Sequence, residues 1–322
     1  MNFTYIMGLL GGLALFLYGM HMMSTGLEAA AGDKLKIILE KLTTNRFAGV
    51  LVGTLITAII QSSSATTVMV VGFVNSGLMT LNQAIWIIMG ANIGTTVTGQ
   101  LIALDVGEIA KMIAFTGVVI IVFIKNEKLK YVGEIMAGLG VLFIGMDMMG
   151  SAMSPLEDSQ SFINLLTKYK NPFLGIMAGA GFTSLIQSSS ASVGILQTLA
   201  DGGVIELKSA AFVLFGQNIG TCITAFLASA GTNRNAKRTT LIHFMFNIFG
   251  TVLFTFLCLT TPLITKVESW TPSNASAQIA NLHTTFNVVT MLLLLPFGTV
   301  LGKIATVILP GSHALQKLQK AI

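Results

Sequence analysis

The sequence is poor in charged residues and in cysteine. Asp, Glu, Lys and Arg together make up 10% of its 322 residues, whereas 53% are hydrophobic. A water-soluble protein of this size needs more polar surface than such a composition can supply. The two cysteines, Cys222 and Cys258, both lie in apolar runs and indicate neither a disulfide framework nor a metal site. The composition therefore predicts a membrane protein.

Signals for several other classes of protein are absent as well. The net charge of +5 comes from lysines and arginines scattered through short loops, without a basic face interleaved with aromatic residues, so we expect no nucleic-acid partner. Residues 1–23 lack the positive segment and the small-residue cleavage pattern of a signal peptide. The sequence has no His/Glu metal motif and no obvious Ser-His-Asp set, so we do not expect an enzyme.

Long apolar runs are the main feature that the sequence does have. Runs at residues 109–124, 239–259 and 279–301 approach or reach the roughly 20 residues that an α-helix needs to cross a bilayer. These lengths favour helices over the shorter strands of a membrane barrel. The fold class is therefore predicted to be an all-α polytopic membrane protein.

An internal repeat organises these runs. The segments at 19–23 (GMHMM), 61–65 (QSSSA) and 90–95 (GANIGT) recur at 145–149 (GMDMM), 187–191 (QSSSA) and 216–221 (GQNIGT). Each pair is separated by the same 126 positions, without a gap. Because unrelated segments would not keep one spacing over this length, the chain is predicted to contain two copies of one unit.

Each copy is predicted to contain a re-entrant helical hairpin and a discontinuous transmembrane helix. As helices, residues 47–60 and 65–76 would each rise about 20 Å, short of the roughly 30 Å hydrocarbon core, so we expect half-helices that meet and turn back. Such a hairpin adds no crossing, and three crossings per copy invert the second copy relative to the first. We predict inverted-topology repeats over 1–126 and 127–262, an outer loop and extra C-terminal transmembrane helix over 263–310, and a cytoplasmic tail over 311–322.

The basic residues orient this arrangement. Thirteen of the eighteen lysines and arginines lie on one side, which the positive-inside rule assigns to the cytoplasm. We therefore predict a multi-pass protein of the cell (inner) membrane, with its N-terminus outside and its C-terminus in the cytoplasm. The first hairpin is expected to open inward and the second to open outward.

Each hairpin turns at a Gln-Ser-Ser-Ser tetrad, a polar run that the interior of a bilayer should exclude. The second half-helix is predicted to begin at Ser63 or Ser189, so its first N–H groups and the positive end of its dipole face the turn. The serine hydroxyls add donors without a fixed charge, and such a set of donors suits an oxyanion. The residues expected to bind it are Ser62, Ser63, Ser64, Ser188, Ser189 and Ser190.

Oxygen ligands for a hard monovalent cation are predicted beside the same serines. The first half-helix should end near Ile60 or Ile186 and present carbonyl groups, and each tetrad glutamine adds a side-chain oxygen. The segments at 90–96 and 216–221 place glycines, which permit an interruption, around an Asn and follow it with hydroxyl groups. The expected cation ligands are Gln61, Asn92, Thr95, Thr96, Gln187, Asn218 and Thr221.

Ordinary structural roles compete with these functional ones. Serine and threonine in membrane helices often bond back to the carbonyl four residues earlier or join two helices. An unpaired polar side chain costs a few kcal/mol in hydrocarbon, so four in a row, repeated once, favour a functional role. The small-residue pairs Gly49/Gly53 and Gly175/Gly179 are instead typical of close packing between the two arms of each hairpin.

Ionisable residues within the apolar runs also fit structural roles. His21 and Asp147 occupy equivalent positions near the ends of predicted spans, where solvated or helix-capping roles are more typical than proton transfer. His243 and His283 are single histidines in apolar spans and are interpreted as satisfied structural residues.

A duplicated Gln-Ser-Ser-Ser hairpin followed by Gly-x-Asn-Ile-Gly-Thr resembles the type II sodium-phosphate cotransporter family over nearly the whole chain. The resemblance implies that the solute is inorganic phosphate, that sodium is the driving ion, and that the tetrads and the Asn/Thr segments form the site. It also implies electroneutral transport, because Gly77 stands where electrogenic members carry an acidic residue. Cys222 stands where the first copy has Thr96, so the two cation sites are expected to be unequal.

We therefore predict a sodium-coupled secondary transporter that imports inorganic phosphate by alternating access, with sodium as co-substrate and no cofactor. No Lys or Arg lies in a predicted half-helix core, so sodium is expected to help hold the phosphate. A sodium-coupled transporter of another oxyanion and an anion channel are the alternatives that the sequence leaves open. The expected partners are phosphate, sodium and the lipid bilayer, and a homo-oligomer is compatible with these features.

Overall fold

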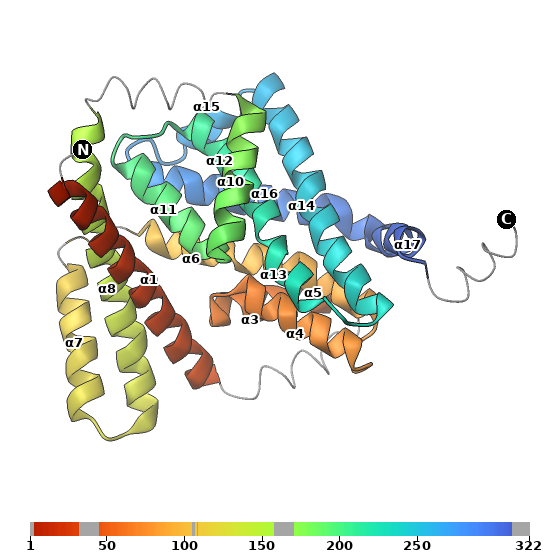
Figure 1. Ribbon diagram of the computed structural model, residues 1–322, viewed down its shortest axis with the longest axis horizontal. Coiled ribbons are helices and arrows are strands. Elements are labelled where there is room, and N and C mark those ends of the chain that lie inside the picture. The colour runs from red at the N-terminus through yellow and green to blue at the C-terminus, as the bar shows by residue number, and fades with distance from the viewer. Residues whose placement is uncertain (1–2, 32–44, 105–106, 108, 158–170, 311–322) are drawn as a thin grey trace, which may run out of the picture.

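The computed structural model describes residues 3–31, 45–104, 107, 109–157 and 171–310, with side chains for all of these except 153–157. Within these residues the regular structure is entirely helical, as Figure 1 shows. The predicted cytoplasmic tail at 311–322 lies outside the described residues.

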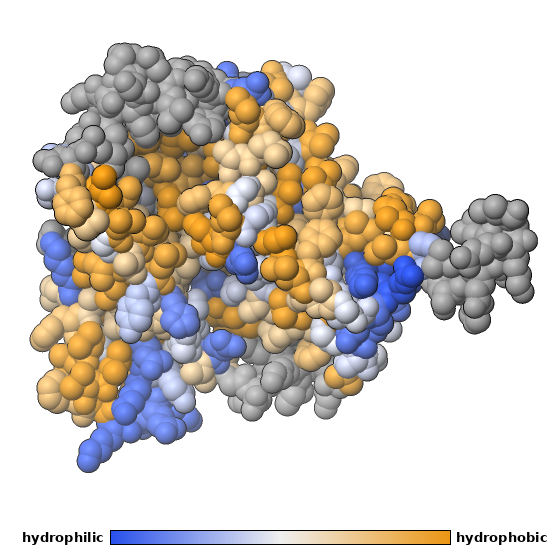
Figure 2. Space-filling model, viewed as in Figure 1, coloured by the Kyte–Doolittle hydropathy of each residue, from blue (hydrophilic) through white to orange (hydrophobic). Residues whose placement is uncertain are grey.

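Six helical stretches among the described residues are long and apolar enough to cross a membrane, which confirms an all-α polytopic membrane protein. Much of the surface in Figure 2 is hydrophobic, as lipid contact requires. The six stretches are Phe3–Ala31, Leu81–Ile102, Glu127–Ala152, Leu207–Ala228, Arg234–Thr260 and Ala275–Ile308.

Three helices form a bundle at one end of the molecule (Figure 1). They are α1 (Phe3–Ala31), α7 (Ile109–Phe123) and α8 (Glu127–Glu157). Glycines let α1 and α8 approach backbone to backbone: a Cβ on Gly19 would lie 2.4 Å from the backbone nitrogen of Leu142. Packing of small residues in this way joins helices in lipid, where the hydrophobic effect contributes little between them.

The sequence repeat is visible in the helix boundaries. In the first copy the helices are α3 (Arg46–Ile60), α4 (Ser63–Asn75), α5 (Leu81–Gly94) and α6 (Thr96–Ile102). In the second they are α10 (Pro172–Ile186), α11 (Ser189–Asp201), α12 (Leu207–Gly220) and α13 (Cys222–Ala228). Every one of these helices begins and ends 126 residues after its counterpart, so equivalent sequences adopt equivalent local structures.

The first residue of each tetrad is the C-cap of the preceding helix. Gln61 and Gln187 close α3 and α10 in left-handed conformations, with φ of 59° and 58°. These are the only non-glycine residues with positive φ in the described part of the chain. A left-handed residue costs roughly 1 kcal/mol unless it is glycine, and such strain gathers at functional sites. The predicted helix ends at Ile60 and Ile186 are confirmed.

The second residue of each tetrad then caps the following helix. The Oγ atoms of Ser62 and Ser188 accept hydrogen bonds from the backbone N–H three residues later, at 3.1 and 3.2 Å. This is the usual N-cap arrangement of serine. The predicted starts of the second half-helices, at Ser63 and Ser189, are confirmed.

The interruption predicted after Gly94 and Gly220 is slight. The single residues between the paired helices, Thr95 and Thr221, keep right-handed helical dihedrals, with φ of −64° and −56°. The glycines serve close packing instead: a Cβ on Gly94 would lie 2.5 Å from the carbonyl oxygen of Thr54 in α3. These glycines therefore have a packing role that was not predicted from the sequence.

The small-residue pairs pack closely, but against a different helix from the one predicted. A Cβ on Gly53 would lie 2.1 Å from the carbonyl oxygen of Ile87 in α5. A Cβ on the equivalent Gly179 would lie 2.0 Å from the carbonyl oxygen of Val213 in α12. The first arm of each hairpin is thus fixed against the discontinuous helix that follows, and the second arm is less tightly bound to it.

The remaining helices surround the two copies. They are α14 (Arg234–Thr260), α15 (Leu263–Glu268), α16 (Ala275–Leu294), the 3₁₀ turn η1 (Leu295–Phe297) and α17 (Gly298–Ile308). A cluster of stacked and edge-to-face rings, Phe215, Phe254 and Phe286, joins α12, α14 and α16. The run predicted as one extra span, 279–301, lies within the membrane-length stretch Ala275–Ile308. That stretch tightens into the 3₁₀ turn η1 at Pro296, which lacks the N–H that an α-helix needs there.

Candidate ion-binding site

The two tetrads meet at the centre of the fold. The hydroxyl of Ser63, at the start of α4, lies 3.4 Å from the hydroxyl of Ser189, at the start of α11. Both side chains are buried, with 3% and 6% of their surface exposed. Residues that are equivalent in the sequence repeat therefore touch in space, and two helix N-termini converge on one point.

Thr95 completes a triangle of hydroxyl groups with these serines. Its Oγ1 atom lies 3.4 Å from Ser189 Oγ and 3.5 Å from Ser63 Oγ. Thr95 is itself buried at the junction of α5 and α6. The prediction that the Asn/Thr segment faces a tetrad therefore agrees with the contacts of Thr95.

The third serine of each tetrad pairs with a threonine of the other copy. Ser190 donates to Thr98 Oγ1 at 3.2 Å, and Thr224 donates to Ser64 Oγ, also at 3.2 Å. Thr98 and Thr224 are equivalent in the repeat, as are Ser64 and Ser190, so the two contacts are related by the internal symmetry. We call these seven side chains the hydroxyl cluster: Ser63, Ser64, Thr95, Thr98, Ser189, Ser190 and Thr224.

Sequence reasoning missed Thr98 and Thr224. A signal for them was present, because both follow the Asn-Ile-Gly-Thr motif at the same spacing, three residues after its threonine. One turn of helix brings this position back to the face on which the motif threonine lies. Extending the repeat comparison by that turn would have included them.

The tetrad glutamines have unequal surroundings. Gln61 is buried, with 4% of its surface exposed; its Oε1 accepts a hydrogen bond from Thr98 Oγ1 at 2.9 Å. Its Nε2 donates to the carbonyl of Ala58. The backbone carbonyl of Gln61 is 3.5 Å from Ser190 Oγ, which links it to the second tetrad. Gln187 is exposed. The internal symmetry therefore breaks at the first residue of the tetrads.

The other predicted cation ligands bond within their own helices. Asn92 and Asn218 donate through Nδ2 to the carbonyls four residues earlier, at 2.8 and 2.9 Å. Thr96 and Thr221 donate to the carbonyls of Ile93 and Gln217. These threonine oxygens keep lone pairs that a cation could use.

Asn218 also has a partner outside its helix. Its Oδ1 lies 3.2 Å from Nε2 of His283 on α16, and both side chains are buried. This contact supports the structural role predicted for His283, and it directs the only carbonyl-type oxygen of the Asn218 side chain toward α16. Asn218 and the hydroxyl cluster therefore have separate partners.

The hydroxyl cluster is electrically neutral, because all seven of its side chains are serine or threonine. The N-terminal N–H groups of α4 and α11 have no acceptor within their own helices and carry the positive ends of two helix dipoles. Chemically, the cluster can donate hydrogen bonds to an anion and offer oxygen atoms to a cation. In the described residues no group of three or more His, Cys, Asp or Glu could hold a metal ion.

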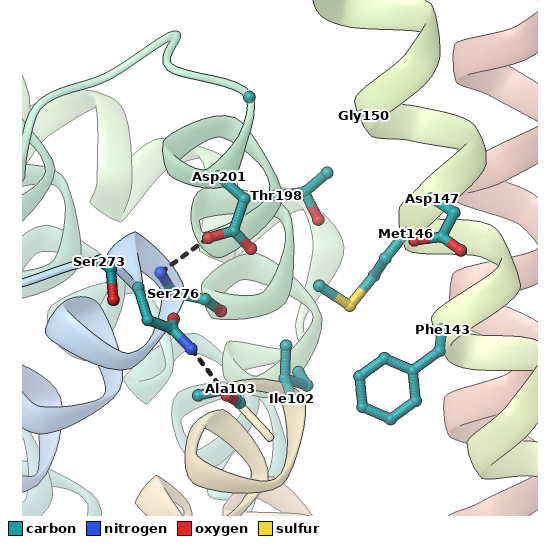
Figure 3. A pocket seen from close by; sticks show the side chains of 12 residues that line it. Ile102, Ala103, Phe143, Met146, Asp147, Gly150, Thr198, Asp201, Ser273 and Ser276 are labelled. Carbon is teal, nitrogen blue, oxygen red and sulfur yellow. Dashed lines mark hydrogen bonds between the residues drawn. The ribbon is translucent and has the colours of Figure 1, made fainter. Parts of the chain in front are cut away.

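A separate acidic cavity lies between α8 and the ends of α6 and α11 (Figure 3). It has a volume of about 410 Å³ and includes Asp147 and Asp201 in its lining. Asp201 accepts a hydrogen bond from the backbone N–H of Ser276 at 2.8 Å. The cavity lies at the C-terminal ends of α6 and α11, whereas the hydroxyl cluster includes the N-terminus of α11. Asp147 and His21 are both exposed.

Comparison with known proteins places these features in a family. The family model described as Na+/Pi-cotransporter matches residues 15–151 and 156–269. "Uncharacterized protein YqeW" of Bacillus subtilis is 32% identical over 297 residues, which cover 92% of this chain and 95% of that protein. No solved structure matches the chain.

Two further relatives carry functional names. "Putative inorganic phosphate export protein YjbB" of Salmonella typhimurium is 25% identical over 299 residues, which cover 92% of this chain and 54% of that protein. The chain thus spans about half the length of YjbB. "Sodium-dependent phosphate transport protein 2A" of Rattus norvegicus is 41% identical over 98 residues, which cover 30% of this chain and 15% of that protein.

Proposed function

The chain belongs to the Na+/Pi-cotransporter family, and from this premise we propose that it is a sodium-coupled transporter whose phosphate site is the hydroxyl cluster. The observation that carries the proposal is the contact between Ser63 and Ser189, which brings the N-termini of α4 and α11 together. Two helix N-termini and several hydroxyl groups can surround one oxyanion.

Phosphate would be held by neutral donors. The N–H groups of Ser63, Ser64, Ser189 and Ser190 lack acceptors within their helices and can donate to phosphate oxygens. The hydroxyls of the same serines add donors, and the capping serines, Ser62 and Ser188, can turn their O–H groups inward while their oxygens still accept from the backbone. A site without a fixed positive charge needs a co-bound cation to neutralise the anion.

Sodium would supply that charge. We place one sodium ion beside Gln61, where three side-chain oxygens lie close together. Thr98 Oγ1 is 2.9 Å from Gln61 Oε1 and 3.2 Å from Ser190 Oγ. Among the other predicted ligands, Thr95 lies in the hydroxyl cluster and could add an oxygen to this ion. Asn92, Thr96, Gln187, Asn218 and Thr221 would contribute only in a state with other side-chain contacts, because the Asn218 oxygen contacts His283 and Gln187 is exposed. Because each ion neutralises the other, sodium should raise the affinity for phosphate, and phosphate should raise the affinity for sodium to the same degree.

The repeats would provide alternating access. We infer two inverted-topology units with re-entrant hairpins, over 1–126 and 127–262, followed by the 263–310 segment, in a multi-pass inner-membrane protein with its N-terminus outside. The unequal burial of Gln61 and Gln187 supports this proposal, because two equivalent segments should differ in exposure in any one access state. Exchange of the two environments would open the site to the opposite side.

Import is the direction that sodium coupling would give, because a sodium gradient directed inward can drive phosphate only inward in symport. Export is a second candidate, favoured by the name of YjbB, which matches 92% of this chain. A transporter that releases phosphate without sodium would have this direction. Competition against labelled phosphate compares other oxyanions as solutes. An anion channel, the other alternative, would carry flux without concentrating its solute.

The test is labelled-phosphate uptake by the full chain in proteoliposomes. With sodium outside and potassium inside, we expect phosphate to accumulate above its external concentration. Equal sodium on both sides should abolish accumulation while leaving exchange intact. Ser63→Ala and Ser189→Ala should reduce uptake, whereas Thr116→Val, an exposed hydroxyl on α7, is the matched control. Uptake that is the same with and without a sodium gradient would rule out sodium coupling and favour the export candidate.

A further inference from the structure

A groove runs between α17 and the start of α5. It has a volume of about 550 Å³, and its lining includes Leu81, Asn82, Ile85, Lys303, Thr306 and Val307. Its walls therefore combine apolar side chains with an ammonium group, an amide and hydroxyl groups. None of these residues belongs to the hydroxyl cluster.

The groove is a fixed feature, because α17 is anchored at both ends. At its start, Gly298 packs so closely on Trp86 of α5 that a Cβ there would lie 2.1 Å from the indole ring. Beyond its last turn, the guanidinium of Arg238 donates to the carbonyl oxygen of Leu309 through Nε at 3.0 Å and Nη2 at 2.7 Å. Between these points, the side chain of Ala305 is fully buried.

The groove carries positive charge. Lys303 is exposed, and the start of α14 brings Arg234, Lys237 and Arg238 to the same end of the molecule. Among the residues that the structure describes, the lining contains no carboxylate. Within the described residues, Arg238 donates hydrogen bonds to the Leu309 carbonyl and the Asn235 side chain, both neutral. The positive charge of this end is therefore available to an anion.

The same end also has an apolar surface. Val300, Val307 and Ile308 of α17 have 44%, 78% and 54% of their surface exposed. Figure 2 shows a hydrophobic surface over α17 directly beside a strongly hydrophilic patch. An exposed apolar face next to clustered basic residues is typical of a helix that lies at the interface of a membrane with anionic lipids.

We propose that this groove binds the headgroup phosphate of an anionic phospholipid, with Lys303 as its ionic partner. Asn82 can donate hydrogen bonds to the phosphate or glycerol oxygens, and an acyl chain leaves along Leu81 and Val307. The Thr306 hydroxyl donates to the carbonyl of Gly302 at 2.8 Å and so is not counted among the donors. A lipid fits better than free phosphate, because inorganic phosphate would leave these apolar walls without a partner. The lipid would hold α17 against α5 at the edge of the repeat that contains the first tetrad.

Native mass spectrometry of the detergent-solubilised full chain tests this proposal. Phosphatidylglycerol and phosphatidylcholine are added in equal amounts, and their bound fractions are compared for the wild type, Lys303→Gln and Lys266→Gln. Lys266 is an exposed lysine on α15 and serves as the matched control. We expect phosphatidylglycerol to be preferred, and Lys303→Gln to lower this preference on the order of fivefold, the effect of one lysine near an anionic lipid.

Three results would overturn the proposal: equal binding of the two lipids by the wild type, the same preference in Lys303→Gln, or displacement of phosphatidylglycerol by millimolar inorganic phosphate. The last result would instead indicate a peripheral phosphate site. Should Lys303→Gln fail to fold, Asn82→Leu and Lys303→Arg replace it; the first should weaken the preference and the second should keep it. The readout is binding, so it does not depend on the proposed transport activity.

Discussion

Replacement of Thr98 by valine removes a hydroxyl that links the two tetrads while nearly conserving side-chain volume. Thr98 Oγ1 donates to Gln61 Oε1 at 2.9 Å and accepts from Ser190 Oγ at 3.2 Å. These contacts join the first tetrad to the second. All three side chains are buried, with 1%, 4% and 5% of their surface exposed for Thr98, Gln61 and Ser190.

The size of the effect follows from the two partners that valine cannot satisfy. A buried polar atom without a partner costs about 1–3 kcal/mol, so loss of both contacts should cost ~2 kcal/mol or more. If this cost falls on the ion-bound state, sodium-dependent phosphate affinity should drop by roughly 30-fold. Thr224, the equivalent residue, makes one contact across the repeats, to Ser64, and one to a carbonyl of its own helix. Thr224→Val should therefore have a smaller effect.

The assay is the initial rate of phosphate uptake in proteoliposomes, measured against sodium concentration and against phosphate concentration. The expected order of loss is Thr98→Val, then Thr224→Val, then Thr116→Val, which should resemble the wild type. Size-exclusion chromatography of each variant reports whether it is folded. A folded Thr98→Val protein with the kinetics of Thr116→Val would refute the reasoning, because the hydroxyl would then serve packing alone.

Two further predictions concern the backbone. Gln61→Gly and Gln61→Ala both remove the carboxamide and should lose uptake, but only glycine relieves the left-handed strain of roughly 1 kcal/mol that alanine retains. The glycine variant should therefore have the higher melting temperature of the two, and equal melting temperatures would contradict this. In Gly90→Ala, a Cβ would lie 2.0 Å from the carbonyl oxygen of Val50, so α3 and α5 must separate at a cost of about 2–3 kcal/mol. Gly72→Ala, which meets nothing within 4 Å, is the control, and similar yields of monodisperse protein for both variants would argue against close packing at Gly90.

The parts of the fold that depend on local chemistry could be predicted from the sequence. Serine is a strong helix cap, so the starts of the half-helices at Ser63 and Ser189 followed from the tetrads alone. The constant spacing of the repeat then required matching boundaries in both copies. The contact of Ser63 with Ser189 was implied by the expectation that the tetrads share a site.

The parts that depend on packing could not be predicted in the same way. A glycine can mark either a break in a helix or a close contact between two helices, and the sequence does not distinguish these roles at Gly94. The structure shows the close contact, because a side chain at Gly94 would clash with the backbone of α3. Asn218 was expected to face the ions, but its oxygen contacts His283, on a helix outside the repeat. Pairings between distant helices, such as Ser190 with Thr98, depend on the relative positions of whole segments.

The central claim is that one neutral site between the tetrads binds phosphate and sodium together. Equilibrium binding of labelled phosphate to the purified protein, in sodium and in an equal concentration of potassium, tests it most directly. We predict that sodium strengthens phosphate binding, that phosphate strengthens sodium binding by the same factor, and that Ser63→Ala and Ser189→Ala weaken both. Phosphate binding of equal affinity in the two salts would contradict the account.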